Sequence, residues 1–339
     1  MRNILAREGY FIETRDGLIF DVKGCIHPQD KIIAYLRYYP DSFGERSKKN
    51  IKYKKVYSIN ERNTILSEKH EEYLVNDPIF DSIIQEVPIK DIIKIHNPIE
   101  FRNKLKNMEN LTELQRNALD FTNQLIQKID LNESMFGITG SPMVSLDKND
   151  SDIDIIIYGS KTIKKARKGL KKLFNNKNEI KKYTIDELKE LYKFKCQDTK
   201  ISWNDFIKLE TRKIFQGKFR GIDFYIRGVK DWNEINVCYG DFSIKNLGTA
   251  TIKGIIQNNI DSIFTPCIYK IKESEIIESK IKDIPINEIF SYRGRFCELL
   301  NKNENFITHG TIEQIIPRTN KSYYRIIIGG NKEDFLKLI

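Results

Sequence analysis

Two aspartates inside an apolar segment are the residues of this sequence whose type and spacing most clearly suggest chemistry. Asp152 and Asp154 alternate with Ile153, Ile155 and Ile157. If this segment is a strand, both carboxylates lie on one face and the isoleucines on the other, because side chains alternate along a strand. Aspartate is depleted in strands, so two of them here require a functional reason. Carboxylates without neighbouring His or Cys favour Mg²⁺ or Mn²⁺ over zinc.

A glycine-serine pair precedes these aspartates by about ten residues. Gly140 and Ser141 follow an apolar segment, 135–138, that we expect to be a strand. Pro142 comes next, at a position where a first helical turn tolerates proline. Such a turn presents backbone N–H groups and a hydroxyl, which suit phosphate oxygens.

A second apolar segment, 221–227, repeats the alternation and carries a third carboxylate. Asp223 and Arg227 are expected to share one face of this strand, opposite its isoleucine and phenylalanine side chains. If the strand pairs beside the one that carries Asp152 and Asp154, three aspartates surround one pocket. Three carboxylates can hold two metal ions around an in-line phosphoryl displacement.

The pattern over about residues 110–230 resembles the polymerase-β-like nucleotidyltransferase superfamily. Its signature is an apolar strand, Gly-Ser, about ten residues, Asp-x-Asp on a strand, and a third Asp on a later strand. More loosely, the chain resembles archaeal nucleotidyltransferase-domain proteins. The residues that match the signature are Gly140, Ser141, Asp152, Asp154 and Asp223.

The resemblance implies a transferase that moves a nucleoside monophosphate from a nucleoside triphosphate, such as ATP, to a hydroxyl group. Gly140, Ser141 and Arg227 would bind the nucleotide. Asp152 and Asp154 would be catalytic residues that bind Mg²⁺ or Mn²⁺, and Asp223 would complete the site as metal ligand or base. The sequence does not determine which nucleotide is used.

The distribution of charge suggests an acceptor. The formal net charge is +10, and residues 161–220 hold 19 Lys+Arg against 7 Asp+Glu. At helical spacing, lysines of this segment form one basic face opposite an apolar stripe. A basic face beside a phosphate-handling pocket favours a nucleic acid, with RNA or tRNA preferred. The predicted nucleic-acid-binding residues are Lys161, Lys164, Lys165, Lys168, Lys171 and Lys172.

Other functions remain open from the sequence. The enzyme could modify a small molecule or a protein, as antibiotic-modifying and antitoxin-type relatives do. Alternatively, the chain could be a catalytically inactive protein that binds nucleic acid. A purely structural interpretation of the lysines is a solvated helix surface, which is the usual role of an isolated run of charges.

The elements that must position these residues predict an α+β fold. A central mixed sheet with helices is flanked by a small N-terminal β module and a β-rich C-terminal module. Residues 1–75 form the first module, in which segments 10–14 and 18–22 make a hairpin and 42–55 is a connection. The catalytic domain spans 76–232 with a basic helical insertion at 161–220, and the C-terminal domain spans 233–339.

Composition excludes several classes of protein. Hydrophobic residues make up 40% of the 339 positions, which is enough to build cores. Apolar runs are too short for a membrane span, and the charged N-terminus predicts no secretory signal, so we expect a cytoplasmic protein. The five cysteines are widely spaced and suggest neither disulfides nor a zinc site.

Overall fold

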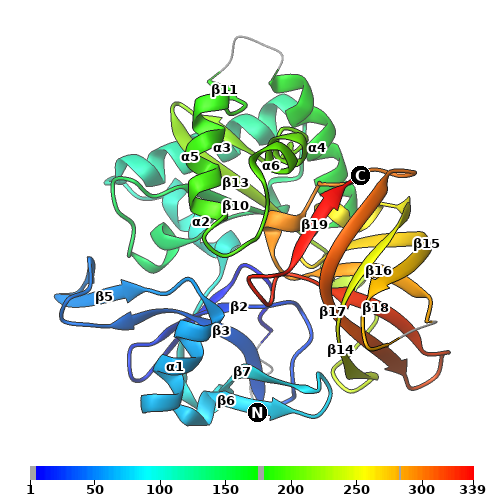
Figure 1. The fold of residues 1–339 in the computed structure, drawn as a ribbon. Coiled ribbons are helices and arrows are strands. Elements are labelled where there is room, and N and C mark those ends of the chain that lie inside the picture. Colours follow the sequence, from blue (N-terminus) through cyan, green and yellow to red (C-terminus); the bar gives the residue numbers. More distant parts are fainter. Residues whose placement is uncertain (1–4, 175–178, 282–283) are drawn as a thin grey trace. The chain divides into compact units, whose positions relative to one another are not determined.

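The structure is a computed structural model that describes residues 5–174, 179–281 and 284–339 (Figure 1). Within these ranges the chain forms six α-helices and three β-sheets, which confirms the predicted α+β class. None of the described helices has the length and apolar character needed to span a membrane. Residues 175–178 of the predicted basic insertion and 282–283 of the predicted C-terminal domain lie outside the described ranges, as do residues 1–4.

Contacts divide the chain into two compact units. The first unit contains both the N-terminal sheet and the central sheet. The predicted N-terminal module and part of the predicted catalytic domain therefore lie in the same unit. The predicted insertion is split, because its later helices belong to the second unit. Unit 1 comprises Met1–Val75, Ile83–Lys182 and Ile214–Val237, and unit 2 comprises Asn76–Ser82, Tyr183–Lys213 and Cys238–Ile339.

The N-terminal sheet has the strand order β4-β5-β3-β2-β1-β8, and β7 pairs with β3 and β6. The predicted hairpin is confirmed, since Phe11 pairs with Asp21 across β1 and β2. Helix α1 (Ile59–Lys69) begins at the cap residue Ser58. The strands are β1 (Phe11–Thr14), β2 (Ile19–Val22), β3 (Lys31–Pro40), β4 (Arg46–Lys48), β5 (Ile51–Lys55), β6 (Leu74–Asp77), β7 (Ser82–Pro88) and β8 (Ile92–His96).

The expected connection at 42–55 is wrong, because β4 and β5 form an edge hairpin there. Lys48 pairs with Ile51, which leaves a loop of two residues, Lys49 and Asn50. Both have positive φ (50° and 65°), which is the geometry of a type I′ turn. The hairpin is largely exposed, so its sequence lacks the apolar alternation of a half-buried strand.

The central sheet of unit 1 has the order β11-β12-β13-β10-β9 and is mixed. As the sequence predicts, β13 lies beside β10; the two strands run parallel, while β9 and β10 run antiparallel. The strands are β9 (Phe136–Thr139), β10 (Ile153–Tyr158), β11 (Ile180–Lys181), β12 (Gln216–Phe219) and β13 (Ile222–Val229).

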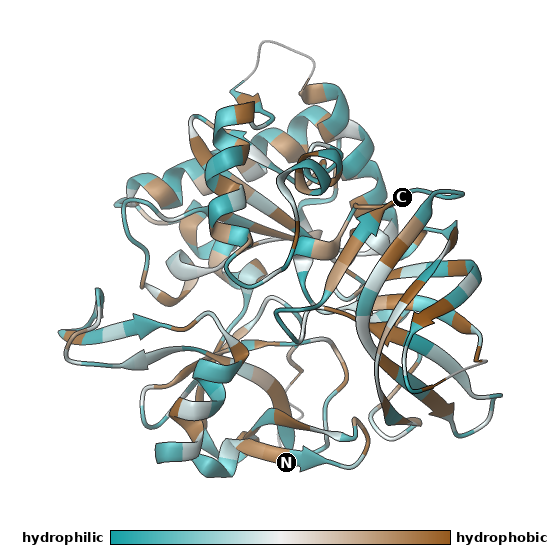
Figure 2. Ribbon diagram, viewed as in Figure 1, coloured by the Kyte–Doolittle hydropathy of each residue, from teal (hydrophilic) through white to brown (hydrophobic). Residues whose placement is uncertain are grey.

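Helices α3 (Glu113–Ile129) and α4 (Ser160–Leu173) pack on one face of this sheet. A capping box formed by Thr112 and Gln115 starts α3. Phe121 of α3 packs with its ring centroid 4.6 Å from that of Phe224 in β13, and the two rings are tilted by 50°. Figure 2 shows hydrophilic and hydrophobic residues alternating along the helices, as amphipathic helices require. This face carries the side chains that alternate with the aspartates.

The N-terminal sheet packs against the opposite face of the central sheet, on which the aspartates lie. Ile156 and Tyr158 of β10 share a buried cluster with Tyr10 and Phe20 of the N-terminal strands. The hydroxyl of Thr139 donates a 2.6 Å hydrogen bond to the carbonyl of Gly9. The two sheets of unit 1 are therefore in contact near Asp154. Helix α2 (Pro98–Lys106) contacts β9.

Unit 2 is built on a closed sheet. Strand β14 pairs with both β15 and β17, so the order β14-β15-β16-β18-β17 closes on itself. Strands β16 and β18 run parallel, whereas the other neighbours in the ring run antiparallel. This Greek-key ring is the topology of the OB-fold. The strands are β14 (Phe242–Asn258), β15 (Cys267–Glu278), β16 (Ile286–Ser291), β17 (Asn305–Pro317), β18 (Tyr323–Ile327) and β19 (Phe335–Leu338).

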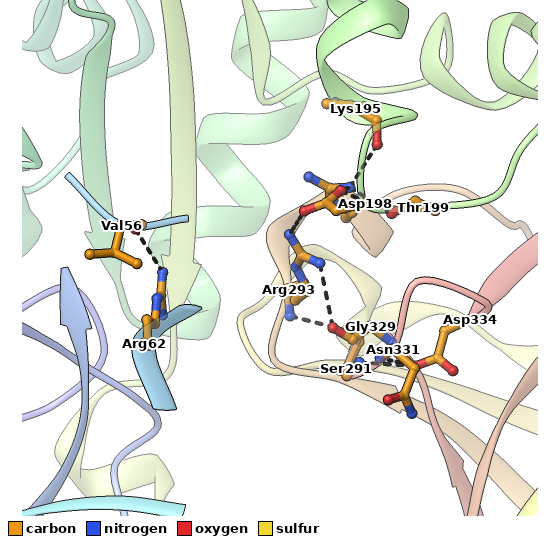
Figure 3. A network of polar contacts seen from close by, with 12 residues as sticks. Val56, Arg62, Lys195, Asp198, Thr199, Ser291, Arg293, Gly329, Asn331 and Asp334 are labelled. Atoms are coloured by element: carbon orange, nitrogen blue, oxygen red, sulfur yellow. Dashed lines mark hydrogen bonds and ion pairs between the residues drawn. The ribbon is translucent and has the colours of Figure 1, made fainter. Parts of the chain in front are cut away.

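Helices α5 (Ile185–Lys195) and α6 (Trp203–Glu210) are attached to the closed sheet by ion pairs (Figure 3). Asp198, which follows α5, pairs with Arg293 at 2.7 Å and also with Arg295. Helix α6 ends at Glu210, and Lys213 donates a hydrogen bond to the carbonyl of Arg295.

Candidate functional site

Strand β10 presents Asp152 and Asp154 at the start of its polar face. Asp154 pairs with Thr139 of β9 and with Tyr225 of β13, so it lies in the middle of three adjacent strands. Asp154 is half-buried, whereas Asp152 is exposed. Ile153, Ile155 and Ile157 are fully buried on the other face, as the alternation predicts. The buried isoleucines fix the direction of both carboxylates.

The Gly140-Ser141 turn lies directly against Asp154. Gly140 has φ +78°, and a Cβ atom at this position would lie 2.4 Å from Oδ2 of Asp154. Such a contact is too short for any side chain, so glycine is required for the turn to approach the carboxylate. Ser141 is buried and begins a 3₁₀ helix, η4 (Ser141–Val144). Pro142 occupies the first turn, as the sequence predicts.

A pocket opens beside this turn between the two sheets of unit 1. Its walls combine acidic, basic and aromatic side chains, and both sheets contribute. The N-terminal sheet supplies Phe11, Asp21, Arg37, Tyr38 and Lys55, and the central sheet supplies Thr139, Gly140, Ser141, Asp154 and Arg227.

The electrostatics of the pocket centre on Asp154. Burial and repulsion from Asp152 together raise its pKa to about 7, while Arg227, Lys55 and Arg37 oppose the increase. The shift therefore reports two carboxylates held close together in a partly desolvated place. A bound cation between them would remove this repulsion.

The donor set fits a metal held by two protein carboxylates. Among the described residues there is no group of three or more His, Cys, Asp or Glu side chains arranged to hold an ion. Mg²⁺ is commonly bound by one or two carboxylates together with substrate phosphates and water. Asp152 and Asp154 are the residues that would hold it, and the raised pKa of Asp154 is the observation that supports this fit.

Asp223 shares the face but does not join the other two carboxylates in a tight cluster. Because Ile153 pairs with Phe224, Asp223 lies across from Asp152 at the same strand end. Its side chain is 53% exposed, and Oδ1 is 3.2 Å from Nζ of Lys218. The structure thus brings Asp223 to the correct face and edge, with a lysine as its neighbour.

Arg227 lines the pocket and is also paired with a carboxylate. Its guanidinium lies 2.5 Å from Oε1 of the fully buried Glu8. Although burial opposes it, the charges of Glu8 and Asp21 raise the pKa of Arg227. Arg227 therefore links the central sheet to the N-terminal sheet within the pocket wall.

The structure does not bring the predicted nucleic-acid-binding lysines to the pocket. Helix α4 buries Ile163, Ala166 and Leu170, and it packs on the sheet face opposite the aspartates. Lys165 forms a 3.0 Å ion pair with Asp130. The lysines form an exposed surface on that side, made of Lys161, Lys164, Lys165, Lys168, Lys171 and Lys172.

Sequence reasoning missed the side chains that the N-terminal sheet contributes. Asp21 and Arg37 interrupt apolar strands, which is the same signal that identified Asp152 and Asp154. The sequence could therefore have identified Asp21 and Arg37 as candidate site residues. Lys55 gave none, because it follows a segment rich in lysine and its pairing with Tyr38 depends on the edge hairpin.

Fold and site together define an α+β protein with an acidic pair beside a glycine-serine turn in a cation-lined pocket. The chain belongs to the same family as "Uncharacterized protein MJ1086" of Methanocaldococcus jannaschii. The two sequences are 30% identical over 337 residues, which cover 97% of each chain. No protein-family model matches the sequence. No solved structure matches it either.

Proposed function

We propose that this protein is a metal-dependent nucleotidyltransferase that transfers a nucleoside monophosphate from a nucleoside triphosphate to a hydroxyl group on the end of an RNA. The observation that carries the proposal is the juxtaposition of Asp152 and Asp154 with the Gly140-Ser141 turn. The Cβ position of Gly140 is only 2.4 Å from Asp154, so phosphates held by the turn would lie next to both carboxylates.

In the proposed reaction, some residues would bind the nucleotide and the metal ion, and Asp223 would transfer a proton. The turn at Gly140 and Ser141 would hold phosphate oxygens through N–H and hydroxyl donors. Asp152 and Asp154 would hold Mg²⁺ or Mn²⁺, which when bound neutralises phosphate charge. The acceptor oxygen bonds to the α-phosphorus, the bond to the bridging oxygen breaks, and pyrophosphate leaves. Asp223 would accept the proton of the attacking hydroxyl.

Two features support RNA as the acceptor. The chain carries a net charge of +10, with exposed lysines along α4. The closed sheet of unit 2 has OB-fold topology, which many oligonucleotide-binding domains use. Support from topology is an analogy between folds, so the acceptor must be identified by experiment.

The test is to incubate the protein with each nucleoside triphosphate, labelled at the α-phosphate, and Mg²⁺ or Mn²⁺, with total RNA, with no acceptor, or with a small-molecule extract. Under the proposal, label enters RNA and pyrophosphate is released. Label in a small molecule or in the protein itself would support the other nucleotidylation reactions instead.

The aspartates provide matched variants. Asp152→Asn and Asp154→Asn should each lower transfer at least about a hundredfold, because each removes a charge needed for metal binding. Asp150→Asn, in the exposed loop before β10, should retain activity. If no nucleotide is transferred to any acceptor, or if the Asp154→Asn variant remains active, the proposed reaction is wrong.

A further inference from the structure

The N-terminal sheet brings cations to the pocket from strands that the catalytic motif does not include. Lys55 of β5 pairs with Tyr38 of β3, so both side chains lie on one face of the sheet, and both line the pocket. Arg37 lines the same wall. Arg46 of β4 is close enough for its charge to oppose protonation of Lys55.

Within the described residues, these cations form no direct ion pair with a carboxylate. In the part of the chain that the structure describes, no ion pair joins Arg37, Arg46 or Lys55 to an acidic side chain, whereas Arg227 in the same pocket pairs with Glu8. Arg37 instead donates to the carbonyl of Val56 at 3.0 Å.

Tyr57 lies close to two of these cations. The Arg37 guanidinium and the Lys55 ammonium each lie 5.0 Å from the Tyr57 ring centroid. A ring face attracts a cation but carries no charge that could neutralise one.

Unpaired positive charges in a half-buried pocket are costly unless an anion binds. Burial, together with the neighbouring charges of Arg37 and Arg46, lowers the pKa of Lys55 to about 8, although Asp152 and Asp154 oppose the decrease. Asp21 lines the same pocket but pairs with Lys23 at 2.6 Å, and Asp154 is the carboxylate proposed to hold the metal, so neither is assigned to these cations. The pocket therefore has an excess of cationic side chains on the N-terminal side.

We propose that Arg37 and Lys55 bind the β- and γ-phosphates of the nucleoside triphosphate, so that the N-terminal sheet forms half of the nucleotide site. This inference rests on the proposed function, because it takes the α-phosphate to lie beside Asp152 and Asp154, with the β- and γ-phosphates between the Gly140-Ser141 turn and the N-terminal sheet. The remaining phosphates then extend from the central sheet toward β3 and β5. A triphosphate matches this arrangement better than a monophosphate, because it has additional charged phosphates for the cations of the second wall.

The test measures binding of inorganic tripolyphosphate by calorimetry at constant ionic strength, without nucleotide or acceptor. Lys55→Met should weaken binding about tenfold, as expected for loss of one charged hydrogen bond. Lys55→Arg should restore most of it. Lys52→Met is the matched control, because this exposed lysine lies on the opposite face of β5 and should leave the affinity unchanged.

A second arm compares nucleoside triphosphate with nucleoside monophosphate. Only the triphosphate should lose affinity in the Lys55→Met and Arg37→Met variants. Equal affinity of wild type and Lys55→Met for tripolyphosphate, or an equal loss for monophosphate, would overturn the assignment. The measurement reports binding alone. The assignment of Arg37 and Lys55 as phosphate ligands can therefore be wrong while nucleotidyl transfer is observed, and it can be right while no transfer occurs. Thermal unfolding of each variant shows whether a loss of binding reflects a loss of fold.

Discussion

At the residue scale, the most informative feature is a carboxylate in a place that suits an apolar side chain. Asp154 lies between Thr139 and Tyr225 in the middle of three strands, and it is half-buried. Placing a charge there costs free energy, and the proposed metal ion would offset that cost. The same reasoning applies to Lys55 on the opposite wall of the pocket.

The raised pKa of Asp154 predicts a pH-dependent stability in metal-free protein. The carboxyl titrates near 7 when folded and near 3.8 when unfolded, so the folded state binds the extra proton between these values. The contribution of Asp154 to the free energy of unfolding should therefore fall as pH rises from about 4 to 7. At pH 8, Asp154→Asn should be more stable than wild type by up to about 4 kcal/mol, because each unit of pKa shift corresponds to about 1.4 kcal/mol.

The measurement is urea unfolding in the presence of a chelator at several pH values. The difference between Asp154→Asn and wild type isolates this group, because other titrating groups contribute to both proteins. Asp150→Asn should show no such trend. A difference that stays constant between pH 4 and 8 would contradict the assignment.

Gly140 permits the close approach of the turn to Asp154, so Gly140→Ala should disrupt the site. The new Cβ would displace the carboxylate, and φ +78° is strained for alanine. We expect a loss of about 1–2 kcal/mol in stability and at least tenfold in tripolyphosphate affinity. Gly248→Ala has a comparable strain at φ +105° with no atom near its Cβ, so it should lose stability alone. Equal affinities of the two variants would argue against the close contact.

At the element scale, the central sheet is held by aromatic packing beneath the strands that carry the aspartates. The Phe121 ring of α3 lies 4.9 Å from Phe219 and 4.6 Å from Phe224, measured between centroids. Phe121 is fully buried. Helix α3 therefore fixes the position of β13 beside β10.

Truncation of this contact should be strongly destabilising. Phe121→Ala should lower the free energy of unfolding by about 3–5 kcal/mol, because it removes buried surface and leaves a cavity. Gln127→Ala, on the exposed side of the same helix, should change stability by less than about 0.5 kcal/mol. Chemical denaturation measures both, and a loss below about 1 kcal/mol for Phe121→Ala would show that α3 does not support the sheet.

At the scale of the whole molecule, basic side chains lie on two separate surfaces, the pocket and the exposed side of α4. The lysines of α4 lie on the sheet face opposite the pocket, so they would not contact a nucleotide bound there as we propose. They can still attract an RNA backbone, whose binding depends on charge more than on sequence.

RNA affinity should therefore depend on salt and on these lysines. The double substitution Lys164→Gln and Lys168→Gln should weaken RNA binding and reduce the slope of log affinity against log salt by about 1–2. Tripolyphosphate affinity should stay unchanged. Fluorescence anisotropy with short single-stranded RNA measures both quantities for RNA, and a salt-independent affinity would show that the lysines form only a solvated helix surface.

The sequence by itself determined the local structure around the site. Alternation identified β10 and the common face of Asp152 and Asp154, and the local spacing of Thr112 and Gln115 is what allows the capping box that starts α3. These features depend on neighbours two to four residues apart, so a linear pattern contains them. For the same reason the exposed hairpin of β4 and β5 was missed, because it buries too little to leave an apolar pattern.

Only the tertiary structure decided what surrounds the aspartates. The N-terminal sheet covers their face and contributes Arg37 and Lys55, and α4 lies on the other face. Asp223 reaches the correct strand end but pairs with Lys218. Such outcomes depend on which distant apolar surfaces bury one another, and local periodicity contains no information about that choice.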